Sequence, residues 1–561
     1  MVPPYVPTEV PNDSRVDTFA RDRLPAPQLL PEFRFDLPEL QFPARINCAT
    51  ELLDRRVALG QGGRRCITGA DGKTWTYADV QAQANRIAQV LVDELGLIPG
   101  NRVLLRGANS PMLAACFLAV FKCGGIAVGS MPLLRAKELT QIATKAQVSI
   151  ALCDARLTDE LFAALPACPT LKAVLHFNAD AAAASSSTSA STPASSSSLE
   201  ARAALKSGHF DNVDTAADDT CLIAFTSGTT GQPKGTMHFH RDLLAACACW
   251  PPHVLRAQPD DVFIGSPPLA FTFGLGGLLL FPLSIGASTV LLEKVGPDAL
   301  LPAIAKHRAT VCFTAPTSYR AMAASAALHD LSSLRKCVSA GEALPAATRL
   351  LWRQASGIEM IDGIGSTEML HIFISADEAH AKPGATGLPV PGYTACVLDD
   401  GGQPLPPGQV GRLAVKGPTG CKYLDDPRQA TYVQDGWNLT GDAYLVDADG
   451  QFVYQARTDD MIISGGYNIA GPEVESALLL HPAVAECGVV GWPDEERGQI
   501  VRAFVVLKPG HDGGAALAQT LQDWVKQQIA PYKYPRAIDF VAELPRTETG
   551  KLQRFRLRSA P

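Results

Sequence analysis

Short apolar runs alternate with longer segments of helical periodicity along most of the chain. Residues 101–105, 148–153 and 172–176 are short apolar runs, whereas residues 78–95 carry apolar side chains at helical spacing. The first pattern predicts strands and the second predicts a helix. Strands that alternate with helices are typical of an α/β fold with largely parallel pairing.

The composition and the strand pattern of the chain change at several points, and these changes predict its domains. Residues 1–45 are Pro-rich and predict an extended arm, while residues 181–198 contain only Ala, Ser and Thr apart from one Pro, which predicts a disordered insertion. From residue 397 onward, short strands with Pro/Gly turns predict a small β subdomain. We expect a large N-terminal domain at 46–457, made of α/β subdomains and the β subdomain, and a smaller, mobile α+β C-terminal domain at 458–561.

Composition and charge exclude two classes of function. A net charge of −7 over 561 residues argues against a general nucleic-acid surface. Residues 262–292 carry no charge and exceed the length of a membrane span, but three prolines and five glycines interrupt them. We therefore expect a buried strand, turn and helix there, and no membrane association. The 14 cysteines include no CxxC pair, which predicts reduced thiols in the cytosol.

A loop rich in glycine and hydroxyl side chains follows the apolar run at 221–225. Glycines let backbone N–H groups converge on an anion, hydroxyls add donors, and a lysine adds a point charge. An ordinary surface loop is the alternative, but the density of donors without an acidic residue favours a phosphate cradle. The segment is not a Walker A loop, because it ends in Pro233-Lys234-Gly235. The candidate phosphate-binding residues are Thr226, Ser227, Gly228, Thr229, Thr230, Gly231 and Lys234.

Two further Gly-rich turns follow predicted strands, at 339–345 and at 362–368. Ligands of open α/β sheets bind outside the carboxyl ends of the strands. We therefore expect the three turns to meet at the carboxyl ends of one sheet and to form a common binding site.

Five segments, in order, resemble the adenylate-forming superfamily of acyl-CoA synthetases, luciferases and adenylation domains. They are the loop at 226–235, Gly365-Ser366-Thr367-Glu368, Thr440-Gly441-Asp442, a hinge segment at 457–469, and Pro545-Arg546-Thr547-Glu548-Thr549-Gly550-Lys551. Ile364 stands where the family commonly has tyrosine. The resemblance spans roughly residues 45–555. It implies an AMP-forming acid–thiol ligase, which makes an acyl-adenylate with release of pyrophosphate and then a thioester of coenzyme A.

The resemblance also implies roles for individual residues. Lys551 would bridge the carboxylate and the α-phosphate, Thr367 would donate to phosphate, and Glu368 would hold Mg²⁺. A solvated lysine and a glutamate at a helix start are the structural alternatives. The expected ATP and AMP site adds Gly341, Glu342, Asp362, Gly363, Asp442 and Arg457 to the phosphate loop, and Asp459, Gly465 and Gly466 would serve the hinge and the CoA tunnel.

The acid pocket is expected to be aromatic. Phe271 and Phe273 would wall a flat pocket, and His371 would hydrogen-bond the carboxylate or an ortho substituent. Ala340 and Gly365 complete the predicted pocket, and ordinary core packing is the alternative for the phenylalanines and the histidine.

The identity of the acid is predicted from resemblance alone. Residues 362–373 resemble benzoate–CoA ligases, and residues 16–22 and 36–40 resemble 2-aminobenzoate–CoA ligases. We therefore expect 2-aminobenzoate, with benzoate or another substituted benzoate as the alternative.

Rival functions differ in their products. A carrier-loading adenylation enzyme would share nearly every motif, but the chain ends at Pro561 without a carrier domain. A P-loop ATPase would release ADP and phosphate instead of AMP and pyrophosphate. The expected ligands are thus a small aryl carboxylate, ATP, Mg²⁺ and CoA, and the one assembly that we consider is a homodimer.

Overall fold

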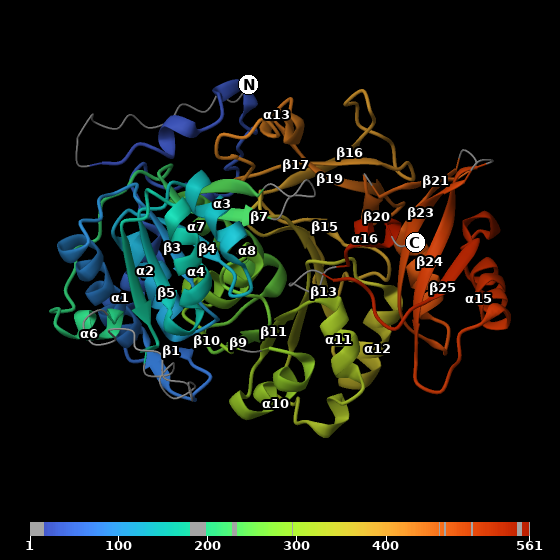
Figure 1. Ribbon diagram of the computed structural model, residues 1–561, viewed down its shortest axis with the longest axis horizontal. Helices are drawn as coiled ribbons and strands as arrows, with labels where there is room; N and C mark the ends of the chain where they lie inside the picture. Colours follow the sequence, from blue (N-terminus) through green and yellow to red (C-terminus); the bar gives the residue numbers. More distant parts are fainter. Residues whose placement is uncertain are drawn as a thin grey trace.

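The computed structural model describes residues 16–179, 198–226, 233–293, 295–458, 460–464, 467–494, 497–546 and 552–559. Figure 1 shows a body formed by the first part of the chain, a β-rich layer on top of it, and the C-terminal part at one end. The predicted insertion at 181–198, except Ser198, lies outside the described residues.

Two α/β sheets form the body of the molecule (Figure 1). The first has the strand order β6-β5-β3-β4-β7-β8, and all of its pairs are parallel except β7–β8. Its strands are β3 (Arg102–Arg106), β4 (Ile126–Ser130), β5 (Ile150–Asp154), β6 (Ala173–Phe177), β7 (Thr220–Thr226) and β8 (Lys234–Phe239).

The second sheet has nine strands in the order β15-β14-β13-β12-β11-β9-β10-β1-β2. Pairing is parallel from β13 to β1 and antiparallel at both ends, which confirms the prediction of a largely parallel α/β fold. Its strands are β1 (Arg65–Thr68), β2 (Thr74–Thr76), β9 (Val262–Gly265), β10 (Ser288–Val290), β11 (Val311–Thr314), β12 (Lys336–Ser339), β13 (Met360–Gly365), β14 (Ile372–Ser375) and β15 (Leu388–Pro389).

Helices surround these sheets, and the sequence explains where several of them begin. Helix α1 starts with a capping box in which Thr76 and Asp79 bond to each other's backbone N–H groups, and α2 starts after Ser110 with Pro111 in its first turn. The other helices of the body are α3 (Ala136–Lys145), α4 (Thr158–Ala164), α6 (Leu199–Ala204), α7 (His240–Trp250), α8 (Thr272–Leu275), α9 (Phe281–Ile285), α10 (Pro297–His307), α11 (Pro316–Ala323) and α12 (Ala346–Ser356), beside α1 (Tyr77–Gln89) and α2 (Pro111–Lys122).

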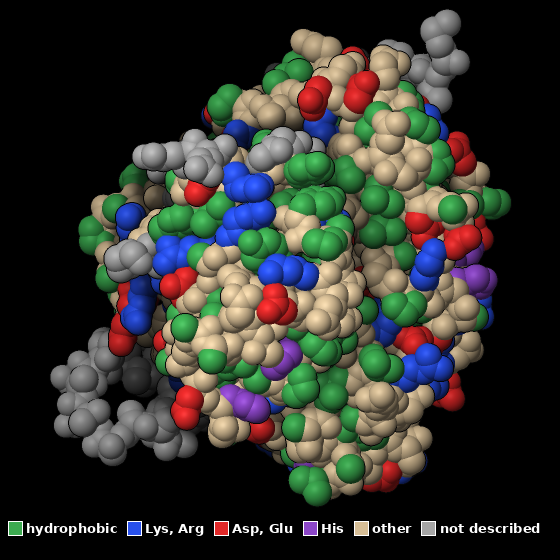
Figure 2. Space-filling view, turned by 90° about the vertical axis from the view of Figure 1, so that its right-hand side faces the viewer, with side chains coloured by type: hydrophobic (Ala, Val, Ile, Leu, Met, Phe, Trp, Pro, Cys, Tyr) green, Lys and Arg blue, Asp and Glu red, His purple; other side chains and the backbone are tan. Residues whose placement is uncertain are grey.

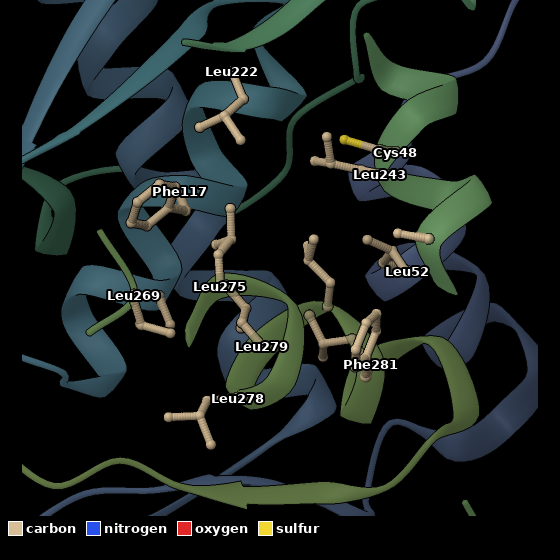
Figure 3. Packing of buried hydrophobic residues seen from close by; sticks show 14 of the residues in the cluster. Cys48, Leu52, Phe117, Leu222, Leu243, Leu269, Leu275, Leu278, Leu279 and Phe281 are labelled. Carbon is tan, nitrogen blue, oxygen red and sulfur yellow. The ribbon is translucent and has the colours of Figure 1, made fainter. Parts of the chain in front are cut away.

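The uncharged segment at 262–292 lies in the core and does not form one long helix. It folds as β9, α8, the π-helical turn η10 (Gly276–Leu280), α9 and β10. Figure 3 shows Leu275, Leu278, Leu279 and Phe281 packed among side chains of other elements, including Phe117. Within the described part of the chain, no helix is long and apolar enough to cross a membrane. The expected strand, turn and helix are therefore confirmed.

The β subdomain and the C-terminal region each contain a five-stranded sheet. The subdomain has β16 (Thr394–Leu398), β17 (Gly411–Lys416), β18 (Val433–Gln434), β19 (Trp437–Val446) and β20 (Phe452–Arg457), with the short helix α13 (Gln429–Tyr432). The C-terminal region has β21 (Ile462–Ser464), β22 (Tyr467–Ile469), β23 (Val484–Asp494), β24 (Gly498–Leu507) and β25 (Ala537–Phe540), with α14 (Gly471–Leu479), α15 (Ala515–Gln528) and α16 (Arg554–Arg558).

The C-terminal region has its own apolar core, in which α14 and α15 pack on the sheet. Figure 2 shows that its outer face mixes basic, acidic and hydrophobic side chains.

All 14 cysteines are free thiols, and all but Cys396 are buried, as the prediction of reduced thiols requires.

Candidate active site

The phosphate-loop segment connects the last two strands of the six-stranded sheet. Thr226, at the end of β7, is the register partner of Lys234, at the start of β8, and the two strands pair antiparallel. The predicted phosphate donors Ser227, Gly228, Thr229, Thr230 and Gly231 lie outside the described residues.

The three Gly-rich turns belong to two sheets, and the prediction of one common sheet is wrong. The loop after β7 lies on the six-stranded sheet, whereas the other two turns follow β12 and β13 of the nine-stranded sheet. The turn after β13 also begins later than expected, at Ser366. Gly363, Ile364 and Gly365 are still paired with β14, where a Cβ on Gly363 would lie 2.7 Å from the Ile372 side chain.

Lys234 and Glu368 come from different sheets and meet at the phenol of Tyr423. The Tyr423 hydroxyl donates to Glu368 Oε1 at 2.5 Å and accepts from Lys234 Nζ at 3.3 Å. Burial, together with the Glu368 carboxylate, raises the pKa of Tyr423 far above its usual value, so the phenol keeps its proton. Tyr423 lies in none of the motifs from which the site was predicted, so it was not among the predicted residues.

Glu368 fits the role of a magnesium ligand. Its side chain is largely buried, and within the described residues Tyr423 hydrogen-bonds Oε1 whereas no bond is made to Oε2. A carboxylate oxygen of this kind suits a hard cation that also binds phosphate. Bound there, Mg²⁺ would neutralise part of the charge of the ATP phosphates.

A second cluster has donors that suit a different kind of metal. The ligand atoms of Cys48, Cys221 and His240 lie within 4.8 Å of one another, and all three residues are buried. His240 Nδ1 already accepts the backbone N–H of Cys48 at 3.1 Å. Sulfur and nitrogen donors do not suit Mg²⁺, so this cluster does not compete with Glu368 for that ion.

The backbone of Thr367 is held by the buried His238, which was also not among the predicted residues. His238 Nε2 lies 2.8 Å from the Thr367 carbonyl oxygen. Because a carbonyl only accepts, Nε2 carries the proton of this hydrogen bond. Burial lowers the pKa of His238 and keeps the ring neutral.

Asp442 and Arg457, predicted for the ATP and AMP site, are register partners on β19 and β20. Arg457 Nη1 donates to Asp442 Oδ1 at 3.0 Å and also to the Thr440 carbonyl at 3.0 Å. Burial raises the pKa of Asp442, and Arg457 acts in the opposite direction. Gly441 has φ +77°, and a Cβ there would lie 2.6 Å from Arg457 Nη2, so the glycine permits this contact.

Three residues predicted for the ATP and AMP site, Gly341, Glu342 and Asp362, lie just after the end of β12 or within β13. Asp362 is the register partner of Ser339, and Ala340, Gly341 and Glu342 follow β12 directly. Gly341 has φ +90°, which glycine adopts readily. Asp362 is 9% exposed, and burial raises its pKa to about 7.

His371, predicted for the acid pocket, is buried among aromatic rings. The ring centroids of Phe281, Phe273 and Trp250 lie 4.4, 5.7 and 5.9 Å from that of His371. Burial lowers the pKa of His371 to about 3, so the imidazole is neutral at ordinary pH. Within the described part of the chain, Phe271 contacts no other aromatic ring. Of the predicted pair, Phe273 is the one whose ring contacts His371.

Small residues make room for His371. A Cβ on Gly276 would lie 2.4 Å from His371 Cδ2, and a Cβ on Gly365 would lie 2.7 Å from the His371 carbonyl oxygen. Ala340, also predicted for this pocket, is 4% exposed.

The predicted catalytic lysine and the predicted hinge residues lie outside the residues that the structure describes. Lys551, Asp459, Gly465 and Gly466 are not among the described residues. The residues on either side of the lysine segment, Arg546 and Leu552, form an antiparallel bridge.

Comparisons with known proteins match these features. The model of the AMP-binding enzyme family matches residues 54–422, and that of the AMP-binding enzyme C-terminal domain matches residues 473–551. Benzoate–CoA ligase of Thauera aromatica is 37% identical over 530 residues, which cover 93% of this chain and 98% of that protein.

Solved structures agree with the sequence relatives. The anthranilate CoA ligase AuaEII in complex with anthranoyl-AMP has a TM-score of 0.87 and 34% identity, and the match covers 93% of this chain and 98% of that one. A benzoate CoA ligase from Burkholderia xenovorans has a TM-score of 0.81 and 32% identity, with 91% of this chain and all (100%) of that one covered. The chain therefore belongs to the AMP-binding enzyme family, as an acid–thiol ligase similar to the benzoate–CoA ligases.

Proposed function

We propose that this chain is an aryl-acid CoA ligase and that its acid is 2-aminobenzoate. In the first step a carboxylate oxygen attacks the α-phosphorus of ATP, the bond to pyrophosphate breaks, and an acyl-adenylate forms. In the second step the thiolate of CoA attacks the acyl carbon and AMP leaves. Benzoate or another substituted benzoate is the alternative acid, because benzoate–CoA ligases are also among the relatives.

The tautomer of His371 is the observation that favours an ortho amino group. His371 Nε2 lies 3.4 Å from the Phe273 carbonyl oxygen, so Nε2 carries the proton and Nδ1 presents a lone pair. Nδ1 is buried and lacks a partner among the described residues. An amino group would supply the missing donor, whereas the ring of benzoate offers only C–H groups.

Charged and polar groups of the chain would act on the nucleotide. Lys234, together with the phosphate loop, would hold the departing pyrophosphate, and Asp442 would accept the ribose hydroxyls while Arg457 orients it. Lys551 would bridge the carboxylate and the α-phosphate where negative charge accumulates.

The two half-reactions need different groups beside the carboxyl group of the acid: Lys551 in the first and the CoA thiol in the second. We infer that the domain at 458–561 rotates about Asp459 between them, which withdraws Lys551 and brings the segment of Gly465 and Gly466 to the CoA thiol. The region's own apolar core supports its movement as a unit.

A panel of acids with ATP and CoA tests the proposal. Formation of AMP and of the CoA thioester is measured for 2-aminobenzoate, benzoate, 2-hydroxybenzoate and a medium-chain fatty acid. We expect the highest kcat/KM with 2-aminobenzoate. Preference for the fatty acid would contradict the aryl assignment, and equal use of benzoate would contradict only the ortho amino group. Adenylate formation without transfer to CoA would instead indicate a carrier-loading enzyme.

A further inference from the structure

A short segment of the β subdomain completes the edge of the phosphate-binding sheet. Residues 421–424 run antiparallel to β8, which is the last strand in the order of its sheet. Met237 N–H donates to the Lys422 carbonyl at 2.7 Å, and Leu424 N–H donates to the Gly235 carbonyl at 2.8 Å. This pairing fixes the position of Tyr423 relative to Lys234, because both residues lie on directly bonded backbone.

The side chain of Tyr423 spans the distance between the two sheets. The residue is 1% exposed, and its hydroxyl contacts Glu368 Oε1 and Lys234 Nζ. The Lys234 ammonium also lies 5.2 Å from the centre of the phenol ring. A protonated phenol is a donor toward a carboxylate, so Oε1 is engaged and Oε2 is left for a cation.

The opposite side of the same segment is anchored by a buried ion pair. Lys422 Nζ lies 2.7 Å from Asp242 Oδ2, and both side chains are fully buried. Asp242 Oδ2 also lies 3.8 Å from Nδ1 of His238, the residue that bonds the Thr367 carbonyl. Successive residues of an extended segment point to opposite sides, so Lys422 secures the backbone while Tyr423 reaches the site.

We propose that Tyr423 is a positioning residue for the metal-binding carboxylate of Glu368. It orients Glu368 by the hydrogen bond to Oε1 and couples that carboxylate to the phosphate-binding Lys234. This inference rests on the proposed function, in which ATP binds with a divalent cation, and on Glu368 as the ligand of that cation, the role that its Oε2, which accepts no hydrogen bond from the described residues, fits in the candidate active site. Groups that orient a metal ligand commonly change metal affinity by about 10–100-fold when removed.

The test measures metal binding separately from turnover. Mn²⁺ is titrated by electron paramagnetic resonance into the full chain with a non-hydrolysable ATP analogue, for the parent, Tyr423→Phe, Glu368→Gln and the double variant. Tyr77→Phe is the matched control, because it also removes a buried phenol hydroxyl, one that donates to the Ala287 carbonyl at 2.7 Å in the core.

We expect Tyr423→Phe to weaken Mn²⁺ binding by about tenfold, Tyr77→Phe to leave it unchanged, and Tyr423→Phe to add nothing once Glu368 is glutamine. Affinity for the analogue in EDTA should be the same in the parent and in Tyr423→Phe. If Mn²⁺ affinity is unchanged in Tyr423→Phe but falls in Glu368→Gln, the positioning role of Tyr423 is overturned and the proposed function stays intact. Unchanged affinity in Glu368→Gln would instead overturn the assignment of Glu368 as the metal ligand.

Discussion

Arg546 Nη1 lies 3.6 Å from Glu342 Oε1, and this ion pair joins the C-terminal region to the turn after β12. Arg546 also pairs with Glu486 of its own region, at 2.7 Å. Arg546 is also the bridge partner of Leu552, so the two described residues that flank the Lys551 segment lie side by side. In the adenylation step that we propose, Lys551 would have to reach the α-phosphate from this side of the region.

Replacing Lys551 by alanine should separate the two half-reactions. Removal of a charge-stabilising donor lowers the rate of the step it serves by about 100-fold or more, so acid-dependent exchange of pyrophosphate into ATP should fall by at least that factor. Thioester formation from supplied acyl-adenylate should be nearly unaffected, because no phosphate attack occurs in it. Arg546→Ala is the comparison, and loss of its partly exposed ion pairs should change exchange by only about fivefold or less. An equal loss in both half-reactions would show that Lys551 does not have this role.

Asp362 should make stability depend on pH in an unusual direction. Burial raises its pKa from 3.8 to about 7, so the folded state favours the protonated carboxyl. Its contribution to stability is complete below pH 4 and is lost as the pH rises toward 7. Asp362→Asn, which has no charge to bury, should stabilise the protein by on the order of 2–4 kcal/mol at pH 8 and by much less at pH 4.5. Urea midpoints of both proteins at the two pH values provide the measurement, and a pH-independent gain would contradict it.

Local signals in the sequence predicted Glu368, Asp442 and Arg457, because each lies in a short motif. The positions of His238 and Tyr423 could not be predicted in this way. His238 gains its role by contact with Thr367, which lies 129 positions away in the sequence. Tyr423 gains its role when residues 421–424 pair with β8, which brings it to Lys234, 189 positions away. No periodicity in the sequence specifies such distant contacts. The same limit explains the error over the three turns, because local strand patterns do not say which sheet a strand joins.

His371 should affect the preference for one acid over another, and this preference should not depend on pH. With a pKa of about 3 the ring stays neutral from pH 6 to 8.5, so the ratio of kcat/KM for 2-aminobenzoate over benzoate should be constant in that range. His371→Leu removes the acceptor at Nδ1 and should lower this ratio by about tenfold, as expected for the loss of one buried hydrogen bond. If both acids lose activity equally, the ring serves only to pack against Phe281 and Phe273.

The ion pair of Lys422 and Asp242 should be costly to break from one side. Although burial acts to raise it, the Lys422 ammonium holds the pKa of Asp242 below its usual range, so the carboxylate is charged. Lys422→Met leaves that charge unpaired in the interior and should destabilise the protein by about 3–5 kcal/mol at pH 8. Lys382→Met is the control for loss of a lysine, because the Lys382 ammonium reaches solvent and its ion pairs with Asp447 and Asp449 should contribute little to stability.

The pH dependence of Lys422→Met distinguishes an unpaired charge from a packing defect. Without the ammonium, burial raises the pKa of Asp242 above that of the unfolded chain, so stability is lost as the pH rises and is recovered on acidification. The deficit relative to the parent should therefore shrink between pH 8 and pH 5, as urea midpoints will show. Adding Asp242→Asn should also reduce the deficit at pH 8, because the buried charge is then absent. A deficit that is equal at both pH values and unchanged in the double variant would mean that lost packing, and not the carboxylate, is responsible.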